Sequence, residues 1–142
     1  MNRQVRRVRV LLVVLFVTAT VGCGGEPLKR DPNVNYGPSN KDMLVDFGAM
    51  LKAYIKEHKK APLKVADFDR YAPAFSGAEE GIRTKTVVYL WGQPINTDAK
   101  AAGTVLAYEK EAEASGGWVL MQDGNVKKMS ADEFKAAPKA GQ

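Results

Sequence analysis

The sequence has very few of the residues from which catalytic and metal sites are commonly built. Its 142 residues include one cysteine, Cys23, and one histidine, His58. A single cysteine cannot form an internal disulfide or a thiolate metal site, so packing alone must hold the folded part together. His58 has no second histidine as a metal partner, and the sequence has no glycine-rich phosphate loop. We therefore expect no catalytic residues, no metal site and no cofactor, and interpret His58 as a solvated residue at a helix end.

A hydrophobic run long enough to cross a bilayer is also missing. The apolar run over residues 10–22 has 13 residues, whereas a membrane-spanning helix needs about 20. Four arginines and no acidic residue precede this run, which is the layout of an export signal. Without residues 1–22 the chain keeps 17 basic and 16 acidic residues, so its net charge falls from +5 to +1. This balance does not favour a nucleic acid as a partner.

The apolar run ends in Thr20-Val21-Gly22-Cys23, which resembles the bacterial lipobox. In proteins with a lipobox, the cysteine after the small residues receives a diacylglycerol thioether and becomes the new N-terminus. Three positions fit that pattern, whereas Thr20 stands where the family prefers leucine or another aliphatic residue. The resemblance implies lipidation of Cys23, with the membrane as a partner through its acyl chains. Cleavage after Ala19 is the alternative, and it would leave Cys23 as a free thiol.

The residue after Cys23 bears on the location of the protein. Lipoproteins retained at the inner membrane commonly carry aspartate there, whereas this chain has Gly24. The resemblance therefore implies an exported protein of the cell envelope, anchored in the outer membrane in preference to the inner membrane.

Composition divides the chain into four parts. Residues 1–22 are the predicted lipoprotein signal peptide. Residues 23–38 contain glycine, proline, asparagine and charge without an apolar period, and we predict a flexible tether from lipidated Cys23. Residues 39–135 are expected to form a single domain, and residues 136–142 a disordered tail.

The first predicted element of the domain is an amphipathic helix over residues 41–59. Ser39 and Asp42 have the spacing of a capping box at its start, and Pro62 prevents its continuation. Apolar residues recur at helical spacing, so one face of the helix must be covered. These residues are Leu44, Phe47, Leu51, Tyr54 and Ile55.

The remainder of the domain favours short strands. Their β-branched and aromatic content predicts strands over residues 82–91, 104–109, 117–121 and 125–129. We predict a loop over residues 76–81. The fold class is therefore expected to be α+β, with the N-terminal amphipathic helix packed on a small antiparallel sheet of three to four strands.

Asp123 and Gly124 give the strongest short hairpin signal in the chain. A two-residue turn would place Trp118 opposite Met129, where a contact between sulfur and ring would close the open end of the hairpin. A capping box that begins at Ser130 predicts a short last helix.

Tyr89 and Trp91 form a possible binding surface. Strand alternation places both side chains on one face, where aromatic rings are able to recognise a partner. Packing of these rings in the core, against the apolar face of the helix, is the alternative interpretation.

Residues 116–128, GGWVLMQDGNVKK, together with the order of one helix and then strands, resemble the head domain of pseudopilin-like proteins. These are related to the major pseudopilin of type II secretion. Pilins keep a long N-terminal hydrophobic helix with a glutamate near its start, which packs into the filament. Residues 10–22 carry no acid and lead to Cys23, so the resemblance covers the head alone.

These observations predict a lipid-anchored, non-enzymatic cell-envelope protein. Its partner would be an envelope protein or a cell-wall component. Two alternatives remain open: a pseudopilin-like subunit of a secretion or pilus machine, and a small exported enzyme with an unrecognised site.

Overall fold

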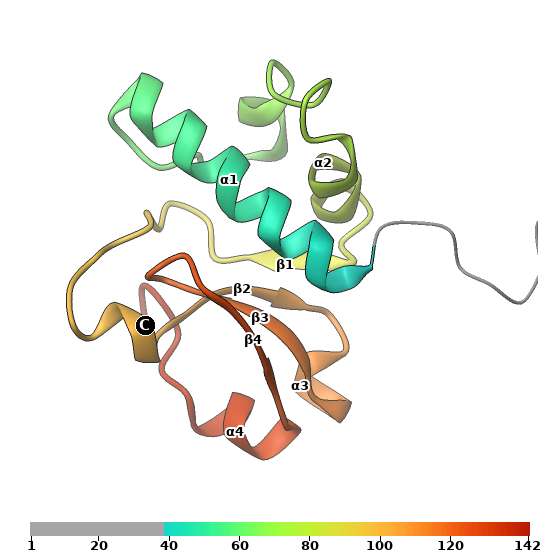
Figure 1. Ribbon diagram of the computed structural model, residues 1–142, viewed down its shortest axis with the longest axis vertical. Helices are drawn as coiled ribbons and strands as arrows, with labels where there is room; N and C mark the ends of the chain where they lie inside the picture. Colours follow the sequence, from blue (N-terminus) through green and yellow to red (C-terminus); the bar gives the residue numbers. More distant parts are fainter. Residues whose placement is uncertain (1–38) are drawn as a thin grey trace, which may run out of the picture. The chain divides into compact units, whose positions relative to one another are not determined.

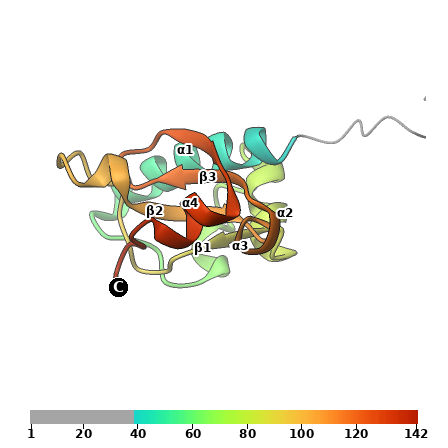
Figure 2. The same ribbon diagram turned by 90° about the horizontal axis from the view of Figure 1, so that it is seen from below.

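The computed structural model describes residues 39–142. The predictions for residues 1–22 and 23–38, including the lipidation of Cys23, lie outside the described residues. Figures 1 and 2 show three layers, in which α1 and α2 cover one face of the sheet while α3 and α4 cover the other. The helices and strands are α1 (Asn40–His58), η1 (Val65–Phe68), α2 (Ser76–Arg83), β1 (Val87–Tyr89), η2 (Ala101–Gly103), β2 (Val105–Glu109), α3 (Ala112–Ser115), β3 (Gly117–Met121), β4 (Val126–Met129) and α4 (Ala131–Ala136).

Helix α1 begins and ends as its sequence predicts, within one residue. The Ser39 hydroxyl accepts a hydrogen bond from the Asp42 backbone N–H at 3.2 Å, and the Asp42 carboxylate accepts one from the Ser39 backbone N–H at 3.3 Å. This reciprocal pair satisfies two of the donors that an uncapped helix leaves free. At the other end Lys59 adopts the left-handed conformation, with φ of 57°, and its N–H donates to the Ile55 carbonyl at 2.8 Å.

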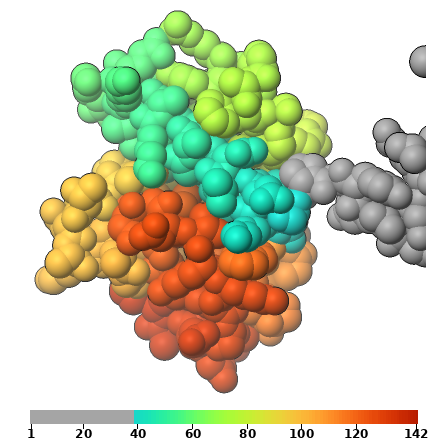
Figure 3. All heavy atoms as spheres, viewed as in Figure 1, coloured from blue at the N-terminus to red at the C-terminus, as the bar shows by residue number. Residues whose placement is uncertain are grey.

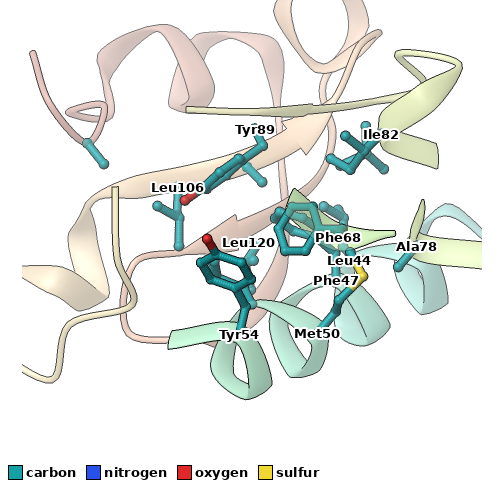
Figure 4. Close-up of a cluster of buried hydrophobic side chains, with 14 residues drawn as sticks. Leu44, Phe47, Met50, Tyr54, Phe68, Ala78, Ile82, Tyr89, Leu106 and Leu120 are labelled. Carbon is teal, nitrogen blue, oxygen red and sulfur yellow. The ribbon is translucent and has the colours of Figure 1, made fainter. Parts of the chain in front are cut away.

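The apolar face of α1 lies on the sheet, which confirms the predicted α+β fold. Leu44, Phe47 and Leu51 are completely buried in a first hydrophobic cluster, which also contains Leu106 and Leu120 of the sheet. Figure 4 shows α1 side chains pointing toward Leu106 and Leu120 of the sheet. Close packing of this kind stabilises the domain through removal of apolar surface from water.

The four strands follow one another in the sheet in the order β1-β2-β3-β4, and every neighbouring pair is antiparallel. All residues of β2 are buried, because helices cover both faces of the sheet. A second hydrophobic cluster lies between the sheet and the layer of α3 and α4. Its buried members are Val105, Tyr108, Ala112, Val119, Met121, Met129 and Phe134.

The prediction for residues 76–91 is wrong in two respects. Residues 76–81, expected to be a loop, belong to helix α2, and the strand expected over residues 82–91 is reduced to β1. The absence of a side chain at Gly81 lets this helix pack closely on β1, because a Cβ at position 81 would lie 3.2 Å from a methyl group of Val87. α2 therefore packs against β1 more closely than a larger side chain permits, and this packing outweighs the low helix propensity of glycine.

The hairpin at Asp123 and Gly124 exists, but its turn has three residues and not two. The Gly124 N–H donates to the Met121 carbonyl at 2.9 Å, and Gly124 has a φ of 90°, which favours glycine. The Met121 N–H donates to the Asn125 carbonyl at 2.8 Å and closes the turn. This is the pattern of a type I turn followed by a glycine bulge.

The extra turn residue shifts the predicted register by one position. Trp118 lies opposite Lys128, and Met129 lies opposite Gly117, so the predicted contact between Trp118 and Met129 does not form. A shift of one residue moves a side chain to the other face of the sheet. Met129 accordingly joins the second cluster, whereas Trp118 packs beside the first, with the Lys41 ammonium 5.1 Å from its ring centroid.

The prediction of a disordered tail over residues 136–142 is also wrong. The Val105 N–H donates to the Pro138 carbonyl and the Ala140 N–H donates to the Val105 carbonyl, both at 2.9 Å. Ala140 is buried in the first cluster. The Lys139 ammonium donates to the Phe134 and Ala137 carbonyls at the end of α4, where a cation is favoured.

Acidification is expected to destabilise the domain through its helix caps. Hydrogen bonds from the backbone N–H of Ser130 and of Leu63 hold the pKa values of Glu133 and Asp67 below their ordinary values. A carboxyl group with a lowered folded-state pKa stabilises the fold above its unfolded pKa, and this contribution is lost as the pH falls through the folded value. The melting temperature should therefore fall from about pH 4 downward. The double variant Glu133→Gln, Asp67→Asn should show a shallower decline, and an equal decline would contradict this assignment.

Candidate functional site

A pocket of about 300 Å³ lies beside strand β1, which forms one edge of the sheet. Its lining comes from three segments that are distant in sequence and is mostly apolar. Val65 belongs to η1, Ile82 and Lys85 belong to the end of α2 and the turn after it, and the remaining residues are those of β1 together with Trp91. We refer to this pocket as the β1 groove.

Two interactions fix the η1 side of the groove, namely a capping carboxylate and a buried aromatic side chain. The Asp67 carboxylate accepts hydrogen bonds from the Leu63 N–H at 2.7 Å and from the Lys64 N–H at 3.2 Å. Phe68 is completely buried and contacts Phe47 edge-on, with the ring centroids 5.7 Å apart. The segment over residues 62–75 therefore sends a side chain into the interior of the core. Val65 is fixed beside the groove as a result.

Tyr89 and Trp91 lie together, as predicted, but only Trp91 reaches the surface. Their rings meet edge-on at 4.9 Å, with Tyr89 at 4% exposure and Trp91 at 37%. The Tyr89 ring also packs on Phe47 at 5.1 Å, and its hydroxyl donates to the Gln93 carbonyl. Burial raises the pKa of the Tyr89 hydroxyl well above its ordinary value, so it stays protonated. Tyr89 is thus a core residue that forms part of the groove lining.

Leu63 extends the apolar surface beyond Trp91. It is 71% exposed, and its side chain lies 3.4 Å from the position of a Cβ on Gly92, the neighbour of Trp91. The Gly92 N–H donates to the Pro62 carbonyl at 3.0 Å, which ties the two segments together. In Figure 3 the segment around residues 60–80, in green, lies at the end of the molecule opposite the later strands and α4. Leu63 and Trp91 form what we call the Leu63–Trp91 patch.

Lys85 is the only charged residue that lines the β1 groove in the described part of the chain. Its φ of 61° places it in the left-handed region, and its N–H donates to the Ile82 carbonyl at 3.2 Å. The ion pairs found over residues 39–142 join Arg70 to Glu57, and Arg83 to Glu79 and Glu80. None of them involves Lys85, so its positive charge is available to a bound anion.

The residues predicted for the hairpin lie apart from the groove. The Asp123 carboxylate accepts hydrogen bonds from the backbone and side chain of Asn125, at 2.9 and 2.8 Å. Gly124 supplies the positive φ that the turn requires, and Trp118 packs beside the first core. These three residues have structural roles in the described domain.

His58, at the end of α1, stacks on the Tyr54 ring with the centroids 4.3 Å apart. Within residues 39–142 no group of three or more histidine, cysteine, aspartate or glutamate side chains is placed to hold a metal ion. No helix in this part of the chain has the length and apolarity to cross a membrane.

No protein-family model matches this chain, and no curated protein or solved structure matches it either. The resemblance of residues 116–128 to pseudopilin heads therefore stays a prediction from the sequence.

Proposed function

We propose that the protein is a lipid-anchored, non-enzymatic protein of the cell envelope whose domain binds another envelope protein or a cell-wall component. The observation that carries the proposal is the β1 groove with its adjoining Leu63–Trp91 patch. The two side chains of the patch are large and apolar, and both are at least partly exposed, next to a concave apolar surface. Apolar patches beside a concavity are typical of binding sites.

The sequence supports the envelope location. Basic residues, a short apolar run and Cys23 in lipobox context imply an anchor outside the cytoplasm. A domain held near a membrane by its N-terminus needs no membrane-binding surface of its own, so the β1 groove is free for a partner.

Crosslinking from the patch tests the proposal. A photo-crosslinking amino acid at Leu63 of the full chain, produced in envelopes of the native host, should give a discrete adduct with one partner. The control carries the same amino acid at Lys128, on the opposite edge strand β4, where no adduct is expected. Equal, diffuse labelling from both positions would contradict a binding role for the patch.

An activity screen tests the non-enzymatic part separately. We expect no turnover from the purified protein in a broad hydrolase and transferase screen. Turnover that a single polar substitution abolishes would overturn this part of the proposal.

A further inference from the structure

We propose that a basic flank of the domain contacts the headgroups of anionic phospholipids and thereby sets the orientation in which the domain is held. This inference rests on the lipid anchor of the proposed function and concerns a surface other than the β1 groove. The flank lies where α1 meets the β3–β4 hairpin. Figure 3 shows the two adjoining on one face, with α1 in cyan to green and the hairpin in orange to red. Its members are Lys41, Val45, Lys52, Trp118 and Lys128.

The three lysines of the basic flank gather along the hairpin. The Lys41 ammonium lies 5.1 Å from the centroid of the Trp118 ring. Lys128 stands directly opposite Trp118 in the β3–β4 pair, and side chains in directly opposite positions share a face of the sheet. The Lys52 ammonium nitrogen lies 2.9 Å from the position of a Cβ on Gly124, in the turn of the same hairpin. Two elements therefore bring three positive charges onto one surface.

The positive charge of the basic flank is not neutralised within the described domain. None of the ion pairs found over residues 39–142 involves a lysine of the flank. The Asp42 carboxylate caps the start of α1, and the Asp123 carboxylate accepts hydrogen bonds within its own turn. Asp46 lies about 100° or more around α1 from each of the helix residues of the flank. The lysines are therefore available to phosphate groups.

Apolar surface accompanies the charge. Val45 is 48% exposed and lies at helical spacing from Lys41, so it belongs to the same side of α1. Trp118 is half-buried beside it in the flank. Tryptophan is favoured at the boundary between lipid and water, because its ring is apolar and its N–H is polar. Lysines near an anionic lipid surface are attracted to it. The composition of the flank therefore suits a membrane surface.

The point at which the tether joins the domain favours lipid over a soluble acidic partner. The described part of the chain begins at Ser39, and Lys41 follows two residues later. A flexible tether over residues 23–38 would have an r.m.s. span of about 20 Å, so the anchor would hold this end of the domain near the headgroups. The acyl chains would supply the attachment, and the basic flank would select the orientation.

This orientation would serve the proposed binding site. Strands β1 and β4 form opposite edges of the sheet, with the β1 groove beside the first and Lys128 on the second. Contact of the basic flank with lipid therefore turns the β1 groove away from the membrane. The groove would then face a partner in the envelope.

The test places an NBD fluorophore at position 45 through the substitution Val45→Cys. The processed protein, whose own Cys23 thiol is blocked by acylation, is reconstituted into vesicles that carry nitroxide-labelled headgroups. Quenching should be strong in phosphatidylethanolamine vesicles with phosphatidylglycerol, weak in those with phosphatidylcholine, and reduced by high salt. A label introduced by Leu63→Cys, at an exposed residue beside the β1 groove, should be quenched weakly in both.

Charge removal separates the basic flank from the overall charge of the protein. In the anionic vesicles, each of Lys41→Gln, Lys52→Gln and Lys128→Gln should lower the ratio of membrane-facing to free domains by roughly fivefold. Matched controls remove one charge from exposed lysines outside the flank and should leave this ratio unchanged. They are Lys60→Gln, Lys127→Gln and Lys135→Gln.

Equal quenching of the label at position 45 in the two kinds of vesicle would overturn this inference, and so would an equal response to the flank and control substitutions. If a discrete adduct still forms from Leu63, the proposed function stands without it. Flank substitutions that abolish the Leu63 adduct without any lipid-dependent quenching would assign the flank to a protein partner and refute lipid contact. A protein that does not enter the vesicles would refute both the lipid anchor and this inference.

Discussion

Replacement of Leu51 by alanine is expected to lower the free energy of unfolding by about 2–5 kcal/mol. Leu51 is completely buried in the first hydrophobic cluster, between α1 and the sheet. Truncation removes apolar surface that is otherwise buried and leaves a cavity that close-packed neighbours fill only in part. Urea denaturation of the variant and of the parent protein gives the difference directly.

Val45 provides a matched control on the same helix. It is 48% exposed, so Val45→Ala should change the free energy of unfolding by no more than about 0.5 kcal/mol. A denaturation curve unchanged by Leu51→Ala would contradict the packing of helix α1 on the sheet.

Helix α1 could be predicted from the sequence because local and global signals agree. Its apolar residues recur at helical spacing, Ser39 and Asp42 form the expected capping box, and Pro62 lies just beyond its end. Strands β2, β3 and β4 were likewise predictable, since each has β-branched or aromatic residues between turn signals.

Helix α2 could not be predicted because tertiary contacts stabilise it and its local sequence does not favour a helix. Ala78, Gly81 and Ile82 become buried only when α1 and β1 are in place, and two glycines in a short segment favour a loop by propensity. The order of the last residues depends in the same way on the pairing of Lys139 with Val105, which are far apart in sequence. The hairpin register was missed because turns of two and of three residues both use glycine with positive φ.

The sequence identified two of the seven residues that line the β1 groove. Trp91 and Tyr89 were predicted from strand alternation, and the structure brings their rings together. Val65, Ile82 and Lys85 were missed, because only the packing of η1 and α2 beside β1 makes them neighbours. No local pattern distinguishes Lys85 from other surface lysines, whereas its place in the lining of the β1 groove does.

Replacement of Cys23 by serine is expected to have the largest effect of all, because it removes the proposed membrane anchor. Serine has no thiol to accept the diacylglycerol thioether. Two acyl chains give stable membrane attachment where one is marginal, so their loss should move the protein from the membrane fraction to the soluble or unprocessed fraction. The fold over residues 39–142 should be unaffected, since all the packing described above lies within it.

Intact mass combined with detergent-phase partitioning tests lipid anchoring most directly. The parent protein should begin at Cys23, carry the mass of a diacylglycerol group and enter the detergent phase, whereas Cys23→Ser should lack the added mass and stay in the aqueous phase if it is exported and cleaved. A parent protein that begins at Thr20 with an unmodified thiol, or that partitions as the variant does, would contradict the lipid anchor.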